Sequence, residues 1–305
     1  MAPAALDSAP ASASFEFAHL TDPHLTSLAD VRAPLGDKRL LGWLSWRRKR
    51  RFRHLPERLA AIVRDIEAAG VHERVVTGDL TQIGLPQEVD AARAWLEALG
   101  GTANVTVVPG NHDLYVADPD DHMLARWAPW MSGDDGVAAF PFLRRRGPVA
   151  FIGLDSAAPS APLLATGRLG DGQLQRLADL LQETGAAGYV RVLLVHHAPL
   201  PGLDPWRKRL TDAPALREVL LRHGAELVLH GHGHHFRVEA LQTPRGAIPV
   251  IQGPSASSAA RDGAHAAAWV HVRVRTAADH MRIELGARRA GADGEAHAFE
   301  FPRGA

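Results

Sequence analysis

The chain has 305 residues, 46% of them hydrophobic, which is enough for one large domain or two modest ones. Its 34 basic and 34 acidic residues cancel, so no overall charge favours nucleic acid or a membrane as a partner. Without cysteine, disulfides and thiolate metal sites are excluded, and we expect a cytoplasmic protein with no membrane-spanning segment.

The hydrophobic pattern predicts strands that alternate with helices and then a strand-rich end. Residues 1–14 are rich in Ala, Pro and Ser and predict a disordered tail. We expect strands at 15–20, 74–77, 104–108, 149–154, 191–195 and 226–229, and helices at 56–69, 86–99, 172–183 and 215–223. A small helix and a loop are expected between 114 and 147, and four more strands at 238–241, 248–251, 269–274 and 281–285. This order predicts one α/β domain over residues 15–301, with helices outside the sheet or sheets.

Five of the predicted strands end in polar side chains that can bind metal ions. In α/β sheets, functional residues gather beyond the carboxyl ends of the strands. A single Asp or His after a strand is usually a turn or hydrogen-bonding residue. The repetition at five strand ends favours a shared metal site instead. The side chains are Asp22, His24, Asp79, Asn111, His112, His196, His232 and His234.

These blocks resemble the motifs of the calcineurin-like metallophosphoesterases and occur in that family's order. The resemblance is greatest to its cyclic-nucleotide and glycerophosphodiester phosphodiesterases. It implies a four-layer α-β-β-α sandwich, in which two mixed β-sheets are flanked by helices, and a dinuclear metal centre. The matching blocks are Asp22-Pro23-His24, Gly78-Asp79, Gly110-Asn111-His112-Asp113, His196-His197-Ala198-Pro199 and Gly231-His232-Gly233-His234.

The same resemblance implies a role for each motif residue. The first metal would take Asp22, His24 and His234, and the second would take Asn111, His196 and His232. Asp79 would bridge the two metals, and His112 would donate a proton to the leaving group. A hydroxide that bridges the metals would then attack phosphorus. Nitrogen and carboxylate ligands favour Mn, Fe or Zn, with Mg also open.

For some of the residues beside the predicted ligands, more than one role is open. His197 adjoins His196 and is expected to support the site rather than bind metal, as is Asp113. A shifted register, with His230 and His232 as the ligands, would also leave one glycine between two histidines. The roles of His230 and His235 are open.

Gln82 stands where members that resemble protein phosphatases carry an acid that orients the catalytic histidine. Glutamine can accept a hydrogen bond but cannot stabilise an imidazolium by charge. We therefore do not expect efficient protein-phosphatase chemistry.

Residues 37–54, called the insertion below, combine Leu and Trp with a dense basic run. Three interpretations are open: a solvated helix edge, an element that lies on an anionic membrane surface, or a cap that draws in an anionic substrate. Nucleic-acid binding is not favoured, because the aromatic residues precede the basic run rather than interleave with it.

The sequence therefore predicts a dinuclear metal-dependent phosphoesterase, more a phosphodiesterase than a monoesterase. Its substrate would be a small or lipid-linked phosphodiester or diphosphate, and the protein would lie in the cytoplasm or at the inner membrane face. The alternative is a non-catalytic scaffold or peripheral membrane adaptor with the same fold, for which missing ligands would be the expected mark. The substrate and the oligomeric state are left open.

Overall fold

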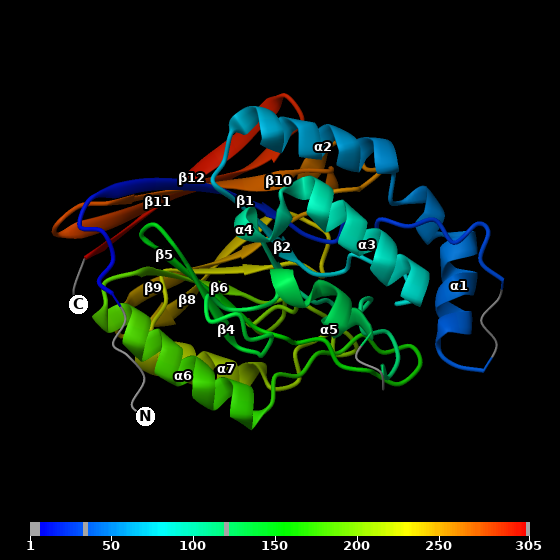
Figure 1. Ribbon diagram of the computed structural model, residues 1–305, viewed down its shortest axis with the longest axis horizontal. Helices are drawn as coiled ribbons and strands as arrows, with labels where there is room; N and C mark the ends of the chain where they lie inside the picture. The colour runs from blue at the N-terminus through cyan, green and yellow to red at the C-terminus, as the bar shows by residue number, and fades with distance from the viewer. Residues whose placement is uncertain (1–6, 33–35, 119–121, 303–305) are drawn as a thin grey trace.

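The computed structural model describes residues 7–32, 36–118 and 122–302 (Figure 1). Its α-helices are α1 (Arg39–Arg48), α2 (Pro56–Ala69), α3 (Pro86–Leu99), α4 (Gly101–Asn104), α5 (His122–Trp127), α6 (Asp171–Ala186) and α7 (Ala213–His223). Three short 3-10 helices are η1 (Arg50–Phe52), η2 (Ala128–Trp130) and η3 (Gly263–His265). The strands are β1 (Ala13–Leu20), β2 (Glu73–Thr77), β3 (Val105–Val108), β4 (Phe142–Arg146), β5 (Val149–Gly153), β6 (Val190–Leu194), β7 (Leu227–His230), β8 (Arg237–Thr243), β9 (Gly246–Gln252), β10 (Trp269–Thr276), β11 (His280–Arg289) and β12 (Ala292–Pro302).

The strands form two six-stranded sheets. The first has the order β12-β11-β10-β1-β2-β3, and β1, β2 and β3 are parallel to one another. The second has the order β4-β5-β6-β7-β9-β8, with a parallel centre and antiparallel edges. Figure 1 shows α2 and α3 over the first sheet and α6 and α7 against the second. The predicted four-layer sandwich of two mixed sheets and outer helices is confirmed.

The core forms because each element has one apolar face. Helix α2 begins with Pro56 at its first turn and ends at Gly70, whose φ of 64° suits a glycine. Ile62 and Ile66, four residues apart, lie on the same face of this helix and are fully buried. Between the sheets, the rings of Phe17 and Phe151 meet edge to face, with centroids 5.0 Å apart. Shortening a buried side chain such as Ile66 to Ala would cost about 2–5 kcal/mol.

Loops at the carboxyl ends of the parallel strands contact one another within and between the two sheets; between the sheets, the His232 N–H donates to Oδ2 of Asp22 at 3.0 Å. The Asp22 N–H donates to the Gly78 carbonyl at 3.0 Å, which connects the loops after β1 and β2. In the second sheet, the Gly231 N–H donates to the His196 carbonyl at 3.1 Å. The predicted motif blocks therefore meet at one edge of the sandwich.

Two strands were not predicted from the sequence. β4 lies in the region 114–147, where only a small helix and a loop were expected, and β12 follows the last predicted strand. Both are edge strands, so one side of each lacks a neighbouring strand; β4 ends in three consecutive arginines, and the first half of β12 holds only small and polar residues. In β4 the buried Arg144 replaces an apolar residue: its guanidinium donates to the carbonyl of Val105 at 2.7 Å.

The amino-terminal end is more ordered than predicted. β1 begins at Ala13, two residues before the expected start, and the buried Ala9 donates its N–H to the Ala187 carbonyl at 2.9 Å. Residues 1–6 of the predicted tail lie outside the described residues.

The insertion forms α1 and η1 beside the carboxyl edge of the first sheet. Trp46 is buried and packs with Leu28 and Ile83 in a small apolar cluster. The indole N–H of Trp43 donates to the Val31 carbonyl at 3.1 Å. Trp43 and Trp46 thus anchor the insertion to the rest of the chain. In the described part of the chain, no helix combines the length and hydropathy that a membrane span requires.

Candidate metal centre

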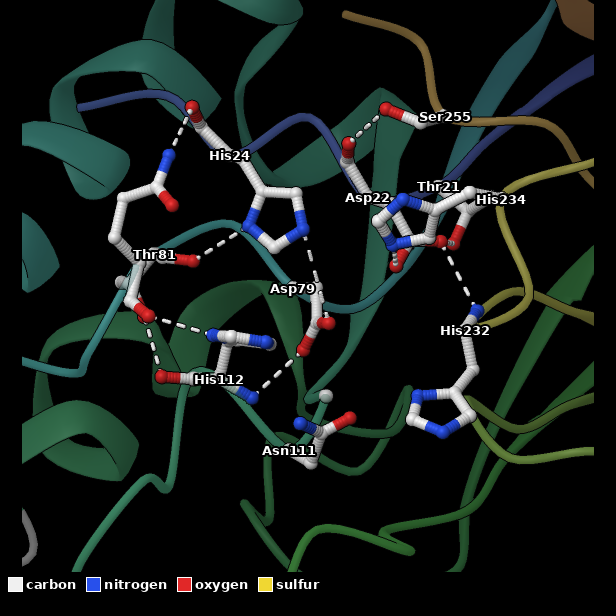
Figure 2. A network of polar contacts seen from close by, with 12 residues as sticks. Thr21, Asp22, His24, Asp79, Thr81, Asn111, His112, His232, His234 and Ser255 are labelled. Carbon is white, nitrogen blue, oxygen red and sulfur yellow. Dashed lines mark hydrogen bonds and ion pairs between the residues drawn. The ribbon is translucent and has the colours of Figure 1, made fainter. Parts of the chain in front are cut away.

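The loops after β1, β2, β6 and β7 bring the predicted ligands into two overlapping clusters. Each residue of a cluster offers one ligand atom, and these atoms lie within 4.8 Å of one another. The first cluster consists of Asp22, His24, Asp79 and His234. The second consists of Asp79, His196 and His232. Asp79 belongs to both, as expected of a bridging carboxylate (Figure 2).

The backbone adopts an unusual conformation at these residues. Among the described residues other than glycine, only six have a positive φ, and five of them are predicted ligands. Left-handed backbone is costly for such residues and persists where the surrounding structure imposes it. The strain therefore gathers at the centre. The five are Asp22 (φ 50°), His24 (φ 43°), Asp79 (φ 57°), His232 (φ 69°) and His234 (φ 56°).

Two glycines allow the loops to approach each other closely. A Cβ on Gly78 would lie 2.5 Å from the Gly110 nitrogen and 2.8 Å from Nδ1 of His196. A Cβ on Gly110 would collide with Asp79. Any side chain at either position would push the loops apart, which explains why glycine precedes both Asp79 and Asn111 in the sequence.

Backbone and hydroxyl groups hold the first cluster in place. Oδ1 of Asp22 lies 2.9 Å from Nε2 of His234, and its Oδ2 accepts hydrogen bonds from the Thr21 hydroxyl at 2.7 Å and the His232 N–H at 3.0 Å. Nδ1 of His24 lies 2.9 Å from the Thr81 carbonyl. Since a carbonyl only accepts, Nδ1 of His24 carries the hydrogen and Nε2 is left free for a cation.

The second cluster is built in the same way. Nδ1 of His196 lies 2.7 Å from the Thr77 carbonyl, which again leaves Nε2 free. That Nε2 is 3.4 Å from Oδ2 of Asp79 and 3.2 Å from Oδ1 of Asn111, so the amide oxygen of Asn111 joins this cluster. Nε2 of the buried His232 has no hydrogen-bond partner among the described residues.

Buried charge sets the electrostatics of the centre. Burial opposes a charge on His196, but Asp79 outweighs this effect and raises the His196 pKa to about 10. Burial raises the Asp79 pKa, yet His196 and His112 hold it well below its usual range. Burial, with His54 and His112 nearby, holds the His24 pKa well below its usual value. The carboxylates of the centre are therefore ionised, as a cation site requires, and a metal ion at Nε2 of His196 would replace the proton that this nitrogen carries without metal.

These observations fit a pair of metal ions. The donors are carboxylate oxygens, imidazole nitrogens and one amide oxygen, which suit divalent transition metals. The orphaned Nε2 of His232 gains a partner when a cation binds. The residues present therefore match the group that the fold implies.

His112 lies at the edge of the centre rather than within a cluster. Its backbone N–H donates to Oδ1 of Asp79 at 2.7 Å, and the centroid of its ring is 5.0 Å from that of the His24 ring. Nδ1 of His112 lies 2.6 Å from the backbone carbonyl of Gln82. Burial lowers its pKa to about 4, against the opposite influence of Asp79.

The Gln82 side chain does not orient His112. Its amide nitrogen donates to the His24 carbonyl at 3.2 Å, and its Oε1 is buried without a partner among the described residues. The backbone carbonyl of Gln82 contacts His112 instead. The side chain at position 82 therefore does not orient the His112 ring directly. A contact made by the backbone cannot be recognised from the sequence.

Asp113 organises the loops. One of its carboxylate oxygens accepts from the N–H groups of Asp79 at 2.8 Å and Gly110 at 2.9 Å, and the other accepts from the Thr81 N–H at 2.9 Å. Through these three hydrogen bonds, Asp113 connects the loop after β2 with the loop after β3. Asp113 belongs to neither cluster.

The remaining histidines of the motifs also lie outside the two clusters. His197 contacts the Ser156 hydroxyl through Nδ1 at 2.8 Å, and its ring centroid is 4.7 Å from that of His232. His230 is buried, and burial lowers its pKa to about 3. His235 contacts the Gly233 carbonyl through Nδ1 at 2.9 Å. Of the histidines from 230 to 235, only His232 and His234 lie in these two clusters.

His54 was missed by sequence reasoning. His54 is the last residue of the insertion. One of its ring nitrogens lies within 4.8 Å of ring nitrogens of His24 and His234, so these three histidines form a third group of possible metal ligands. Its ring centroid is 4.2 Å from that of His24, and its Nδ1 lies 3.0 Å from the Ser257 hydroxyl. No strand precedes His54, so only its place beside a basic run could have drawn attention to it.

Comparisons with known proteins agree with this geometry. The model of the calcineurin-like phosphoesterase family matches residues 15–236. A "probable cyclic nucleotide phosphodiesterase" of Synechococcus sp. is 30% identical over 182 residues, which are 58% of this chain and 63% of that protein. The chain thus spans less than two thirds of this relative's length.

Solved structures with low sequence identity share the fold. A dimetal phosphatase from Danio rerio superposes with a TM-score of 0.63 at 18% identity, over 93% of this chain and 98% of that chain. A purple acid phosphatase from seeds of yellow lupin, Lupinus luteus, gives 0.57 at 12% identity, over 95% of this chain and 54% of that chain.

Proposed function

Because the chain belongs to the calcineurin-like phosphoesterase family, we propose that it is a metal-dependent phosphodiesterase. Members of this family use a dinuclear metal centre, and membership supports hydrolysis of phosphoesters. The observation that carries the proposal is the pair of clusters that share Asp79. Together the two clusters contain donors for two cations.

Two bound metal ions would activate a water for attack on phosphorus and balance the charge that develops on the phosphate. We assign the first ion to Asp22, His24 and His234, the second to Asn111, His196 and His232, and Asp79 to both. The many nitrogen donors favour Mn, Fe or Zn over Mg.

His112 is the proposed proton donor. The hydrogen bond from its backbone N–H to Asp79 fixes its main chain, and its Nδ1 is hydrogen-bonded to the Gln82 carbonyl. Nε2 is therefore the nitrogen that can give a proton to the leaving oxygen. Before this transfer the ring carries a hydrogen on both nitrogens and is positively charged; a bound phosphate anion would favour this form against the burial that lowers the His112 pKa to about 4. After the transfer the ring is neutral, and Nε2 takes up a proton from solvent.

One observation favours a diester over a monoester: the Synechococcus relative is described as a probable cyclic nucleotide phosphodiesterase. The neutral amide of Asn111 leaves the centre more positive than another carboxylate would, which favours the binding of a phosphate anion of either kind. The insertion, which borders the centre through His54, suits either a small or a lipid-linked diester or diphosphate.

A metal analysis combined with a substrate panel tests the proposal. The panel contains an aryl diester, an aryl monoester, a cyclic nucleotide and a UDP-linked lipid. We expect two metal equivalents per chain and faster turnover of diesters. His112→Ala should keep both equivalents and lose about 10²–10⁴-fold in kcat. Fully loaded protein that hydrolyses none of the four would favour the scaffold alternative.

We also propose contact with an anionic membrane surface at the cytoplasmic side. None of five exposed cations of the insertion forms an ion pair with a described residue. Phe52, in their midst, is 61% exposed. Sedimentation with vesicles of phosphatidylglycerol, against vesicles of phosphatidylcholine, tests this contact: equal recovery with both would refute it. The cations are Arg47, Arg48, Lys49, Arg51 and Arg53.

A further inference from the structure

One basic side chain of the insertion turns inward. Arg50 opens η1, and it is the only basic residue between positions 47 and 53 that is not exposed. One of its terminal nitrogens donates to the Gly42 carbonyl of α1 at 2.8 Å. Its Nε is buried and has no hydrogen-bond partner among the described residues. The side chain therefore runs from the insertion into the protein.

The other end of this guanidinium reaches the proposed proton donor. Nη1 of Arg50 donates to the Gln82 carbonyl at 3.0 Å and lies 2.9 Å from Nδ1 of His112. Nδ1 itself lies 2.6 Å from the same carbonyl. Two acceptors do not approach so closely, so Nδ1 carries a hydrogen and donates it to the Gln82 carbonyl. That oxygen thus accepts from Arg50 and His112 together.

Stability does not explain the position of Arg50. Within the described ranges it forms no ion pair, and burial lowers its pKa. Taking a cation out of water without a paired carboxylate is unfavourable. The Gln82 side chain points to His24 and does not hold His112. The backbone carbonyl that does hold His112 is fixed in turn by Arg50.

We propose that Arg50 is a positioning residue for the hydrolysis and acts through the Gln82 carbonyl on His112. This inference rests on the proposed function. In the step that Arg50 serves, the bond from phosphorus to the leaving oxygen breaks while the bond to the water oxygen forms. His112 gives the Nε2 proton to the leaving oxygen, while the hydrogen on Nδ1 stays bound to Nδ1 and is still donated to the Gln82 carbonyl. Arg50 fixes the ring plane and so the direction of Nε2.

Leaving-group dependence separates this role from a merely structural one. p-Nitrophenyl methyl phosphate releases a phenolate that leaves without protonation, whereas phenyl methyl phosphate releases a more basic oxygen that needs a proton. We expect Arg50→Met to lower kcat about 10–100-fold for the phenyl ester and at most about threefold for the nitrophenyl ester. KM and the two metal equivalents should not change, and Arg50→Lys should recover part of the loss.

Two controls accompany these variants. Arg58→Met removes the same charge from an exposed position of α2 and should leave both rates unchanged. His112→Ala should show the same leaving-group dependence as Arg50→Met, only larger. If His112→Ala shows it and Arg50→Met slows both esters equally, the inference is wrong and the proposed function stands. If His112→Ala hydrolyses both esters at the wild-type rate, the proposed function fails and the inference with it.

A measurement on the unaltered protein covers the case in which Arg50→Met does not fold. Long-range ¹H–¹⁵N spectra of the metal-loaded protein report the tautomer of each histidine, and His112→Ala identifies the His112 signals. We expect a hydrogen-bonded Nδ1–H for His112. A neutral His112 ring with its hydrogen on Nε2 only would overturn the inference, because Nδ1 would then not donate to Gln82.

Discussion

Asp79→Asn is the substitution that best tests a shared carboxylate. Asparagine keeps the size of the side chain and an oxygen that can accept the His112 N–H, now at 2.7 Å from Oδ1 of Asp79. It removes the negative charge that both clusters share. The substitution should therefore weaken both metal equivalents while the fold persists. Asp22→Asn removes a carboxylate that lies in the first cluster only, and it should weaken one.

The distances set the size of the effect. Oδ2 of Asp79 lies 3.4 Å from Nε2 of His196 and 3.9 Å from Nε2 of His24, so a cation between these atoms lies within about 4 Å of the carboxylate. Two unit charges 4 Å apart interact by about 4 kcal/mol at an effective dielectric constant of roughly 20. A divalent ion at least matches this value. The dissociation constant of each metal should thus rise about 10³-fold or more.

Isothermal titration of the metal-free protein with Mn²⁺ measures both equivalents, and circular dichroism checks the fold. Asp179→Asn, which removes an exposed carboxylate on α6, should bind metal as the wild type does. If Asp79→Asn binds two equivalents with wild-type affinity, or Asp22→Asn weakens both as strongly, Asp79 does not bridge two metal ions.

Four further substitutions test the surroundings of the centre. His54→Ala should weaken the binding of one metal equivalent about tenfold or more, and Ser257→Ala should weaken it less. If metal titrations of His54→Ala match those of the wild type, His54 does not belong to the centre. Glu88→Ala leaves three backbone N–H groups of the loop 82–85 without their acceptor and should lower the free energy of unfolding by about 3 kcal/mol or more, which denaturant unfolding measures. Burial raises the Asp155 pKa to about 7 from 3.8, so its carboxyl favours the folded state most at low pH and loses this contribution as pH rises through 7. Asp155→Asn should therefore stabilise the protein more at pH 8 than at pH 5, by about 1 kcal/mol or more; equal gains would contradict the buried position.

The sequence by itself determined most of the helices and strands and the order of the motif blocks. Helix α2 could be predicted because Ile62 and Ile66 recur at the helical period and Pro56 and Gly70 mark its ends. Asp79 and His196 could be singled out because each follows a continuous apolar strand. Such patterns are local, so they are readable without knowing which strands become neighbours.

Contacts between distant segments were decided by the tertiary structure alone. Arg50 and His54 belong to an insertion whose composition equally suits a solvated edge, and nothing local shows which basic side chain turns inward. His112 is held by the backbone carbonyl of residue 82 rather than by an acidic side chain there. Since every residue has a backbone carbonyl, the sequence gives no sign of this contact. β4 and β12 pair at sheet edges, and which strand each one pairs with cannot be read from its own sequence. The chain encodes the ligands as a local pattern, but only packing decides which side chains support them.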